Sequence, residues 1–112
     1  MNVPVLSRAL LLETPARQPD GAGGYVAGWT ALGTVWAALE PRTGRDAGGE
    51  GAALALMRYR IVLRAAPEGS SMRPRAGQRF RLGARVFRIQ AVAEHDARAR
   101  YLECFAQEEE AT

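Results

Sequence analysis

Hydrophobic and polar residues alternate with a period of two over several short stretches of this chain. The clearest stretch covers residues 57–65, where Tyr59, Ile61 and Leu63 alternate with Arg58, Arg60, Val62 and Arg64. Successive side chains of a β-strand point to opposite faces of the sheet, so this period predicts a half-exposed strand and not a helix.

Residues 78–93 repeat the alternation on both sides of Gly83, which predicts two further strands joined by a tight turn. The side expected to face the core carries Phe80, Leu82, Phe87, Ile89 and Ala91. The opposite side carries Arg79, Arg81, Arg85, Arg88 and Gln90.

Four more strands are expected, over residues 8–14, 25–32, 34–40 and 100–107. Pro15 is expected to end the first, and a turn to separate the second from the third. In the third, Trp36 lies on the face opposite to the aliphatic residues Val35, Ala37 and Leu39. Both Trp29 and Trp36 are expected in the core, unless the position of Trp36 places it against a second layer or another subunit.

The remaining segments have the composition of loops. Asp20 to Gly24 reads DGAGG and predicts a turn. The segment from Arg42 to Met57 is Gly-rich at first, and its residues 52–57 are helix formers, which predicts a loop leading into one short helix. Residues 108–112 read EEEAT and predict an acidic, solvated tail. Six or seven short strands with at most one helix indicate a mainly β protein, a small antiparallel barrel or sandwich.

Length and composition fit one domain with one core, covering residues 1–112. Of the 112 residues, 47% are hydrophobic. All 15 basic residues are Arg, and with 12 acidic residues the formal net charge is +3, too small an excess to indicate nucleic-acid binding by itself. The apolar run at the N-terminus is too short for a signal peptide or a membrane span, so we expect no membrane partner and assembly in the cytoplasm.

No group of residues indicates catalysis, a metal or a cofactor. Glu94, His95 and Asp96 are consecutive, and their side chains diverge in a segment with turn composition. Cys104 is the only cysteine and is expected to be a buried small apolar residue, not a nucleophile. We therefore expect a protein that is not an enzyme and has no cofactor.

The arginines of the predicted strands suggest three interpretations. Those that can gather on one sheet face are Arg58, Arg60, Arg64, Arg79, Arg81, Arg85 and Arg88. They can form a solvated face with ion pairs worth roughly 0–1 kcal/mol each, or an interface where guanidinium groups meet carboxylates of another subunit. The third interpretation is a small basic barrel that binds RNA or single-stranded DNA. Such proteins interleave exposed aromatic side chains with the basic ones, whereas Tyr59, Phe80 and Phe87 fall on the expected core side.

An ordered series of motifs resembles one known family. Arg8, Leu10 and Leu12 open it, followed by DGxGG at residues 20–24, Trp29, and VWAxLEPxxGR at residues 35–45. RxRI at residues 58–61, MRP at 72–74, RFRLGxRVFRIxAV at 79–92 and RYLEC at 100–104 complete the series. Together these motifs resemble the head–tail adaptor, or head-closure, proteins of tailed phages, prophages and gene transfer agents.

The resemblance implies a virion structural protein with a β-barrel fold. It implies a homo-oligomeric ring, with six or twelve copies, between the portal–adaptor complex and the tail terminator ring. Such a ring retains packaged double-stranded DNA, which passes through its lumen. In such rings the segment from Arg42 to Met57 projects toward neighbouring subunits or the lumen. The residues expected to make ring or partner contacts are Asp20, Gly21, Gly23, Gly24, Trp36, Arg42, Arg45, Arg58, Arg60, Arg64, Arg79 and Arg81.

Overall fold

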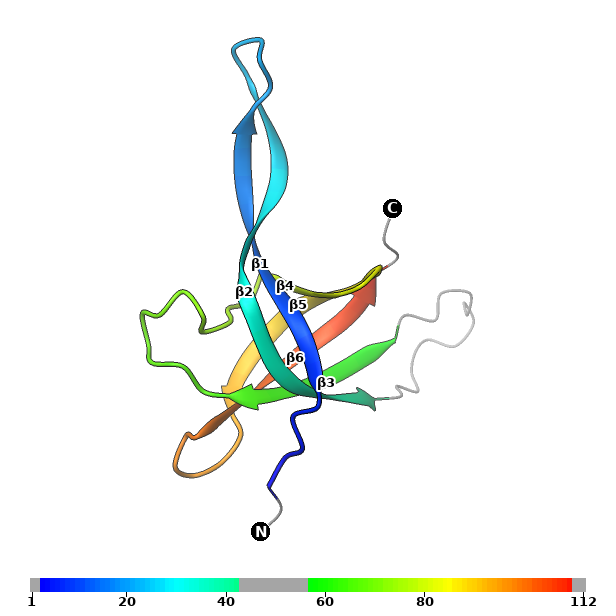
Figure 1. Cartoon of the computed structure of the whole chain (residues 1–112), viewed down its shortest axis with the longest axis vertical. Coiled ribbons are helices and arrows are strands. Elements are labelled where there is room, and N and C mark those ends of the chain that lie inside the picture. Colours follow the sequence, from blue (N-terminus) through cyan, green and yellow to red (C-terminus); the bar gives the residue numbers. More distant parts are fainter. Residues whose placement is uncertain (1–2, 43–56, 110–112) are drawn as a thin grey trace.

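The computed structural model describes residues 3–42 and 57–109, and all the regular structure in these residues is β-strand (Figure 1). The six strands are β1 (Arg8–Pro19), β2 (Tyr25–Arg42), β3 (Arg58–Arg64), β4 (Arg79–Leu82), β5 (Arg85–Glu94) and β6 (Tyr101–Glu109). The described residues contain no helix of the length and apolar character needed to cross a bilayer.

The strands form a closed barrel in the order β1-β2-β3-β6-β5-β4, and every neighbouring pair is antiparallel. A short ladder closes the ring, in which Leu11, Leu12 and Glu13 of β1 pair with Arg81, Phe80 and Arg79 of β4. Closure removes the unpaired sheet edges at which strands of other molecules add. The predicted small, mainly β barrel is confirmed.

The core lies inside the barrel and is built from alternate residues of the strands. Its largest fully buried side chains include Phe80, Phe87, Leu10, Leu12 and Ile61. The inward positions predicted on the strands around Gly83 are confirmed for Phe80, Phe87 and Ile89, and Leu82 packs against the core half-buried.

Two expectations about β3 and β5 were wrong in detail. Ala91 was predicted inside but is exposed, because β5 has an extra residue at Gln90, between the pairs Ile89–Ala106 and Ala91–Phe105. This β-bulge reverses the inward and outward positions beyond it, so Val92 packs against the core instead. Val62 was predicted on the half-exposed side of β3; it lies outside the core cluster of Tyr59, Ile61 and Leu63, but it is fully buried and not exposed.

The predicted second and third strands are one continuous strand, β2, so the turn expected between them is absent. Leu12 pairs with Gly33 and Glu13 with Ala31, which leaves Leu32 as the extra residue of a bulge. Gly33 has φ +152°, and a Cβ there would lie 2.9 Å from Sδ of Met72. Glycine at position 33 therefore permits both the bulge and the close approach of Met72, and the sequence signal that suggested a turn marks a bend instead.

β1 also runs beyond its predicted end at Pro15 and continues to Pro19, paired with β2 from Tyr25 onward. Beyond the Leu32 bulge the two strands leave the barrel and project as a two-stranded hairpin, at the top of Figure 1, while residues 3–7, which precede β1, lie at the opposite end of the described chain. We call residues 14–30 the projecting hairpin. The proline did not end the strand because only β2 pairs with β1 here, and an unpaired edge tolerates a missing N–H.

Other expectations fall partly or wholly outside the described residues. Arg45 and the short helix expected at residues 52–57 lie outside them, except for Met57. The acidic tail was expected from residue 108, but Glu108 and Glu109 belong to β6 and only residues 110–112 lie outside.

Candidate interaction surfaces

The tip of the projecting hairpin is a tight loop organised by Asp20. Its Oδ1 accepts hydrogen bonds from the N–H groups of Ala22 and Gly24, at 2.8 and 3.0 Å. Those two bonds lower the pKa of the Asp20 carboxyl. Gly21 and Gly23 have φ values of +85° and +90°, a region that suits glycine. The turn predicted from DGAGG is therefore confirmed, and the structure places Asp20, Gly21, Gly23 and Gly24 together at an exposed end.

Large apolar side chains are exposed near both ends of the molecule. At the hairpin tip Tyr25 and Val26 are 61% and 50% exposed. Away from it, Val3 and Val5 precede β1, and Trp36, which pairs with Ala9, is 58% exposed. Both tryptophans were expected in the core, and neither lies there. The alternation that placed Trp36 opposite Val35, Ala37 and Leu39 was correct.

Trp29 joins the base of the hairpin to the barrel. The guanidinium carbons of Arg79 and Arg88, which pair across β4 and β5, lie 4.1 and 5.1 Å from its ring centroid. Cation–π contacts of this kind stabilise by roughly 0.5–2 kcal/mol, more when desolvated. Hairpin residues and Arg88 line a hollow of about 500 Å³ beside Trp29: Pro15, Ala16, Arg17, Ala27, Gly28, Trp29 and Arg88.

Glu13 holds two arginines of β4 at the same junction. Its Oε1 lies 2.6 Å from Nε of Arg79 and 3.5 Å from Nε of Arg81. The side chains of Glu13 and Arg79 are only 11% and 14% exposed, so this pair is more shielded than an ordinary surface ion pair. Neither Glu13 nor Trp29 was predicted as a partner for these arginines, because register across separate strands is not visible in the local pattern.

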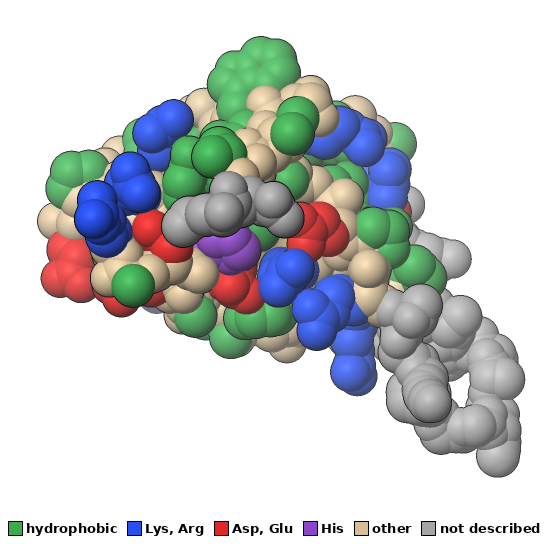
Figure 2. Space-filling view, turned by 90° about the horizontal axis from the view of Figure 1, so that it is seen from below, with side chains coloured by type: hydrophobic (Ala, Val, Ile, Leu, Met, Phe, Trp, Pro, Cys, Tyr) green, Lys and Arg blue, Asp and Glu red, His purple; other side chains and the backbone are tan. Residues whose placement is uncertain are grey.

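The arginines of the strands do not form one face. β3 and β4 lie three strands apart in either direction around the closed barrel, so Arg58, Arg60 and Arg64 face a different side from Arg79 and Arg81. Figure 2 looks at the end opposite the hairpin and shows basic, acidic and hydrophobic side chains intermingled. The arginines therefore do not gather on one sheet face, because the strands that carry them lie on different sides of a closed barrel.

Many of these arginines pair with carboxylates of the same chain. Arg60 lies 2.8 Å from Glu40 and 3.7 Å from Glu103. Arg85 donates to Glu108 and to the hydroxyl of Tyr59, and Arg88 lies 3.6 Å from Glu109. Arg64 instead lies over the ring of Tyr101, 5.5 Å from its centroid. Of the interpretation as a solvated face, the ion pairs are present, but they are distributed around the barrel and do not lie on one face.

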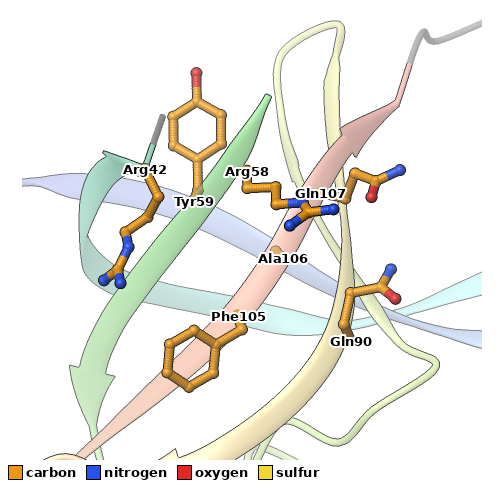
Figure 3. Close-up of a pocket in the computed structure, with 7 residues that line it drawn as sticks. All are labelled: Arg42, Arg58, Tyr59, Gln90, Phe105, Ala106 and Gln107. Carbon is orange, nitrogen blue, oxygen red and sulfur yellow. The ribbon is translucent and has the colours of Figure 1, made fainter. Parts of the chain in front are cut away.

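Arg42 and Arg58 border a hollow where β2 ends and β3 begins. It has a volume of about 530 Å³ and is lined by Arg42, Arg58, Tyr59, Gln90, Phe105, Ala106 and Gln107. Figure 3 shows Arg58 and Gln107 side by side, as their pairing between β3 and β6 requires. The lining combines two guanidinium groups and two amides with aromatic rings and has the composition of an interface.

Cys104, His95 and Asp96 occupy structural positions. Burial raises the pKa of the Cys104 thiol to about 12, so it is not a thiolate at neutral pH. Nδ1 of His95 lies 3.0 Å from Glu103, and Oδ1 of Asp96 accepts from the N–H groups of Arg100 and Tyr101. The predicted turn and the predicted buried cysteine are confirmed. Within the described residues no three His, Cys, Asp or Glu side chains are grouped to hold a metal.

Comparison with protein families decides which kind of barrel this is. Residues 1–109 match the family model described as phage head completion protein. The chain belongs to this family. Family membership confirms the resemblance to head-closure proteins and identifies a structural component of phage-like virions. Among curated proteins the chain has no significant match.

Two solved structures share the fold. One is described as the virion of a native gene transfer agent particle, and a chain in it is 50% identical, with a TM-score of 0.79, over 98% of this chain and 100% of that chain. The other is the solution structure of protein SF1141 from Shigella flexneri 2a, 26% identical with a TM-score of 0.68, over 96% of each chain. The likeness extends over nearly the whole head completion chain in both cases.

Proposed function

We propose that this head completion protein assembles into a ring that closes the head of a phage-like particle. The ring, of six or twelve copies, lies between the portal–adaptor complex and the tail terminator ring. It retains packaged double-stranded DNA and provides the surface to which the tail attaches. In this proposal the chain acts by binding and not by catalysis.

The observation that carries the proposal is the exposure of large apolar side chains near both ends of one small chain. Trp36, Tyr25 and Val5 are each more than half exposed, and such side chains are enriched where proteins meet. The radius of gyration is 15.5 Å, larger than the roughly 13 Å of a compact domain of this length. A surface drawn out in this way suits a subunit with several neighbours. The 50% identical chain in a gene transfer agent virion supports a role as a component of such a particle.

Removal of the gene from the producing strain tests the proposal. We expect heads that fail to join tails and that lose DNA, counted by electron microscopy and by DNase-protected DNA per particle. Expression of the intact chain in trans should restore both. Tailed, DNA-filled particles made without the chain would refute the closure function.

The alternative of a single-stranded nucleic-acid binder has less support, because carboxylates of the same chain pair with Arg60, Arg79 and Arg85. A binder of this type loses affinity steeply as salt increases. We expect purified protein to show weak binding to single-stranded oligonucleotides at low salt, measured by fluorescence anisotropy. Tight, salt-sensitive binding would favour the alternative.

The hairpin tip is a further part of the proposal, as a contact with an adjacent ring. The variant that replaces Gly21, Ala22 and Gly23 by Asn-Gly retains Asp20 and Gly24 and shortens only the loop. We expect unchanged thermal unfolding and a loss of tail joining. Normal numbers of tailed particles would show that tail joining does not require a contact of the hairpin tip with an adjacent ring.

A further inference from the structure

The two edges of the projecting hairpin differ in the backbone groups they offer. Asp20 N–H donates to the Gly24 carbonyl at 3.0 Å, and in an antiparallel ladder hydrogen-bonded pairs alternate with pairs whose backbone groups point outward. Counting from Asp20–Gly24, the outward-pointing pairs are Pro19–Tyr25, Arg17–Ala27 and Pro15–Trp29.

Prolines block one edge and leave the other open. On the β1 edge, Pro15 and Pro19 have no N–H, so only Arg17 offers a donor. On the β2 edge, Tyr25, Ala27 and Trp29 each keep an N–H and a carbonyl that point away from β1. β2 pairs with β3 only from Ala37 onward, so no described strand occupies this edge. Prolines are a common protection of sheet edges against pairing, and here they protect one edge only.

The segment before β1 has the features of a strand that could occupy this edge. We call residues 3–7 the N-terminal arm. Val3 and Val5 are 69% and 76% exposed, while Pro4 and Leu6 are half-buried, an alternation with the period of a strand. In an extended arm, Val3, Val5 and Ser7 direct their backbone groups to one side, and Pro4 falls where no N–H is required. The 3.2 Å hydrogen bond from Ser7 N–H to the Val5 carbonyl would open as the arm straightens.

The arm cannot reach the hairpin of its own chain. From Arg8, where β1 begins, to Arg17, which pairs with Ala27, the strand advances roughly 30 Å at about 3.3 Å per residue. Val5 lies three residues before Arg8 and can extend only about 10 Å from it. The arm and the hairpin also point to opposite ends of the molecule in Figure 1. A contact between them must therefore join two copies.

We propose that the N-terminal arm of one copy adds as a strand to the open edge of β2, at Tyr25, Ala27 and Trp29, in the next copy. The inference rests on the proposed ring and specifies one of its contacts. Arm and edge are different surfaces, so the contact is heterologous, the type that closes into rings. It covers apolar side chains that one copy leaves exposed, Val3 and Val5 on the arm and Tyr25 at the edge.

Paired cysteines test the contact in assembled particles. Residues 5 and 27 would face each other as a hydrogen-bonded pair with Cα atoms about 5.5 Å apart, a separation that a disulfide spans. We expect particles carrying V5C and A27C in one chain to give covalent multimers of the chain after mild oxidation, on a non-reducing gel. The matched control, V5C with R17C, places the second cysteine on the proline-blocked edge and should remain monomeric. Cys104 is buried, so we do not expect it to form these crosslinks.

A proline substitution tests the same edge without a crosslink. Ala27→Pro removes one outward N–H and leaves the hairpin ladder intact. Arg17→Pro removes the N–H on the opposite edge of the same pair, and Arg17→Ala controls for the loss of the guanidinium, whose carbon lies 4.7 Å from the centroid of the Tyr25 ring. We expect Ala27→Pro to reduce the yield of tailed, DNA-filled particles by about tenfold or more, the effect of roughly 1.4 kcal/mol per contact. Arg17→Pro should stay within about twofold of Arg17→Ala, and the purified Ala27→Pro and Arg17→Pro proteins should both unfold at the wild-type temperature.

The outcomes separate this contact from the ring itself. If the chain is present in tailed particles and V5C/A27C yields only monomer, or multimers no more abundant than V5C/R17C, the strand addition is wrong and the ring stands. A crosslink to a protein of different mass would also overturn it, because the edge would then receive another partner. Absence of the wild-type chain from purified particles would instead refute the proposed function.

Discussion

β1 and β2 build both the barrel and the projecting hairpin, and the two regions hold the same strands in different ways. In the barrel, Leu10 and Leu12 of β1 are fully buried and each strand has a partner on both sides. In the hairpin, Tyr25 and Val26 are mostly exposed and each strand has a partner on one side. A two-stranded ribbon alone is marginally stable in water. The barrel therefore supplies stability, and the hairpin is free to present a surface.

The junction between the regions explains how the hairpin keeps its direction. The bulge at Leu32 turns β2 out of the barrel, and Arg79 and Arg88 hold Trp29 against β4 and β5. Glu13 fixes Arg79 from β1. Substitutions in the barrel should therefore affect folding, and those in the hairpin should affect assembly.

The largest effect is expected in the core. Phe87 is fully buried and lies edge-to-face with Tyr59, with ring centroids 5.1 Å apart. Phe87→Ala should lower the free energy of unfolding by about 3–5 kcal/mol, measured by denaturant titration. Tyr25→Ala is the matched hairpin variant and should change it by less than about 0.5 kcal/mol. A similar loss in both would show that the hairpin is part of the folding core.

The next largest effect on the free energy of unfolding is expected at the junction. Glu13→Ala leaves Arg79 shielded and without its carboxylate, which should cost about 1–3 kcal/mol in unfolding free energy. Glu13→Gln retains a hydrogen-bond acceptor and should cost less. Glu40→Ala breaks the more exposed pair with Arg60 and should cost at most about 1 kcal/mol. Equal losses at Glu13 and Glu40 would contradict the special role of the junction.

The barrel was predictable from the sequence to a larger extent than the hairpin. Period-two alternation placed Phe80, Phe87 and Ile89 inside because the core imposes a one-sided pattern on each strand. It failed at Ala91, because a bulge adds a residue without a local signal. The exposed hairpin has no such pattern, and Pro15 and Gly33, which usually mark strand ends, here occupy an open edge and a bend.

The surfaces were less predictable than the fold. Turn composition indicated the loop at Asp20, and the alternation along the strand placed Trp36 opposite the aliphatic side chains, although its 58% exposure was not expected. For Arg79, a candidate contact residue, the structure adds intrachain contacts with Glu13 and Trp29 at the junction. The partners of an arginine depend on which strands are neighbours in the closed barrel, and a local pattern does not contain that order.

Replacement of Trp29 should have a smaller effect on the free energy of unfolding, and replacement of Trp36 provides the comparison. Trp29→Ala removes the cation–π contacts at the hairpin base and should cost about 1 kcal/mol. It should also increase amide hydrogen exchange at Val26 and Gly28, whose positions alternate with the outward-pointing ones. Trp36→Ala should leave the free energy of unfolding and the hydrogen exchange of the hairpin unchanged, and it should reduce particle assembly. If exchange in the hairpin does not respond to Trp29→Ala, the junction does not hold the hairpin in place.

The smallest effect is expected from acidification, which distinguishes the barrel from the hairpin tip. The hydrogen bond from Arg85 lowers the pKa of Glu108 below its ordinary value of 4.5. A folded-state pKa below the unfolded one stabilises the fold above the unfolded pKa, and this contribution is lost as the pH falls through the folded pKa. The pair is part-exposed, so the loss should be below about 1 kcal/mol, and Glu108→Gln should remove that part of the pH dependence.

The pKa of Asp20 is lowered too, but its protonation should change NMR shifts only in the loop, because no core contact depends on it. If acidification still lowered the global stability of Glu108→Gln but not that of Asp20→Asn, the pH dependence would arise at the hairpin tip and not in the barrel.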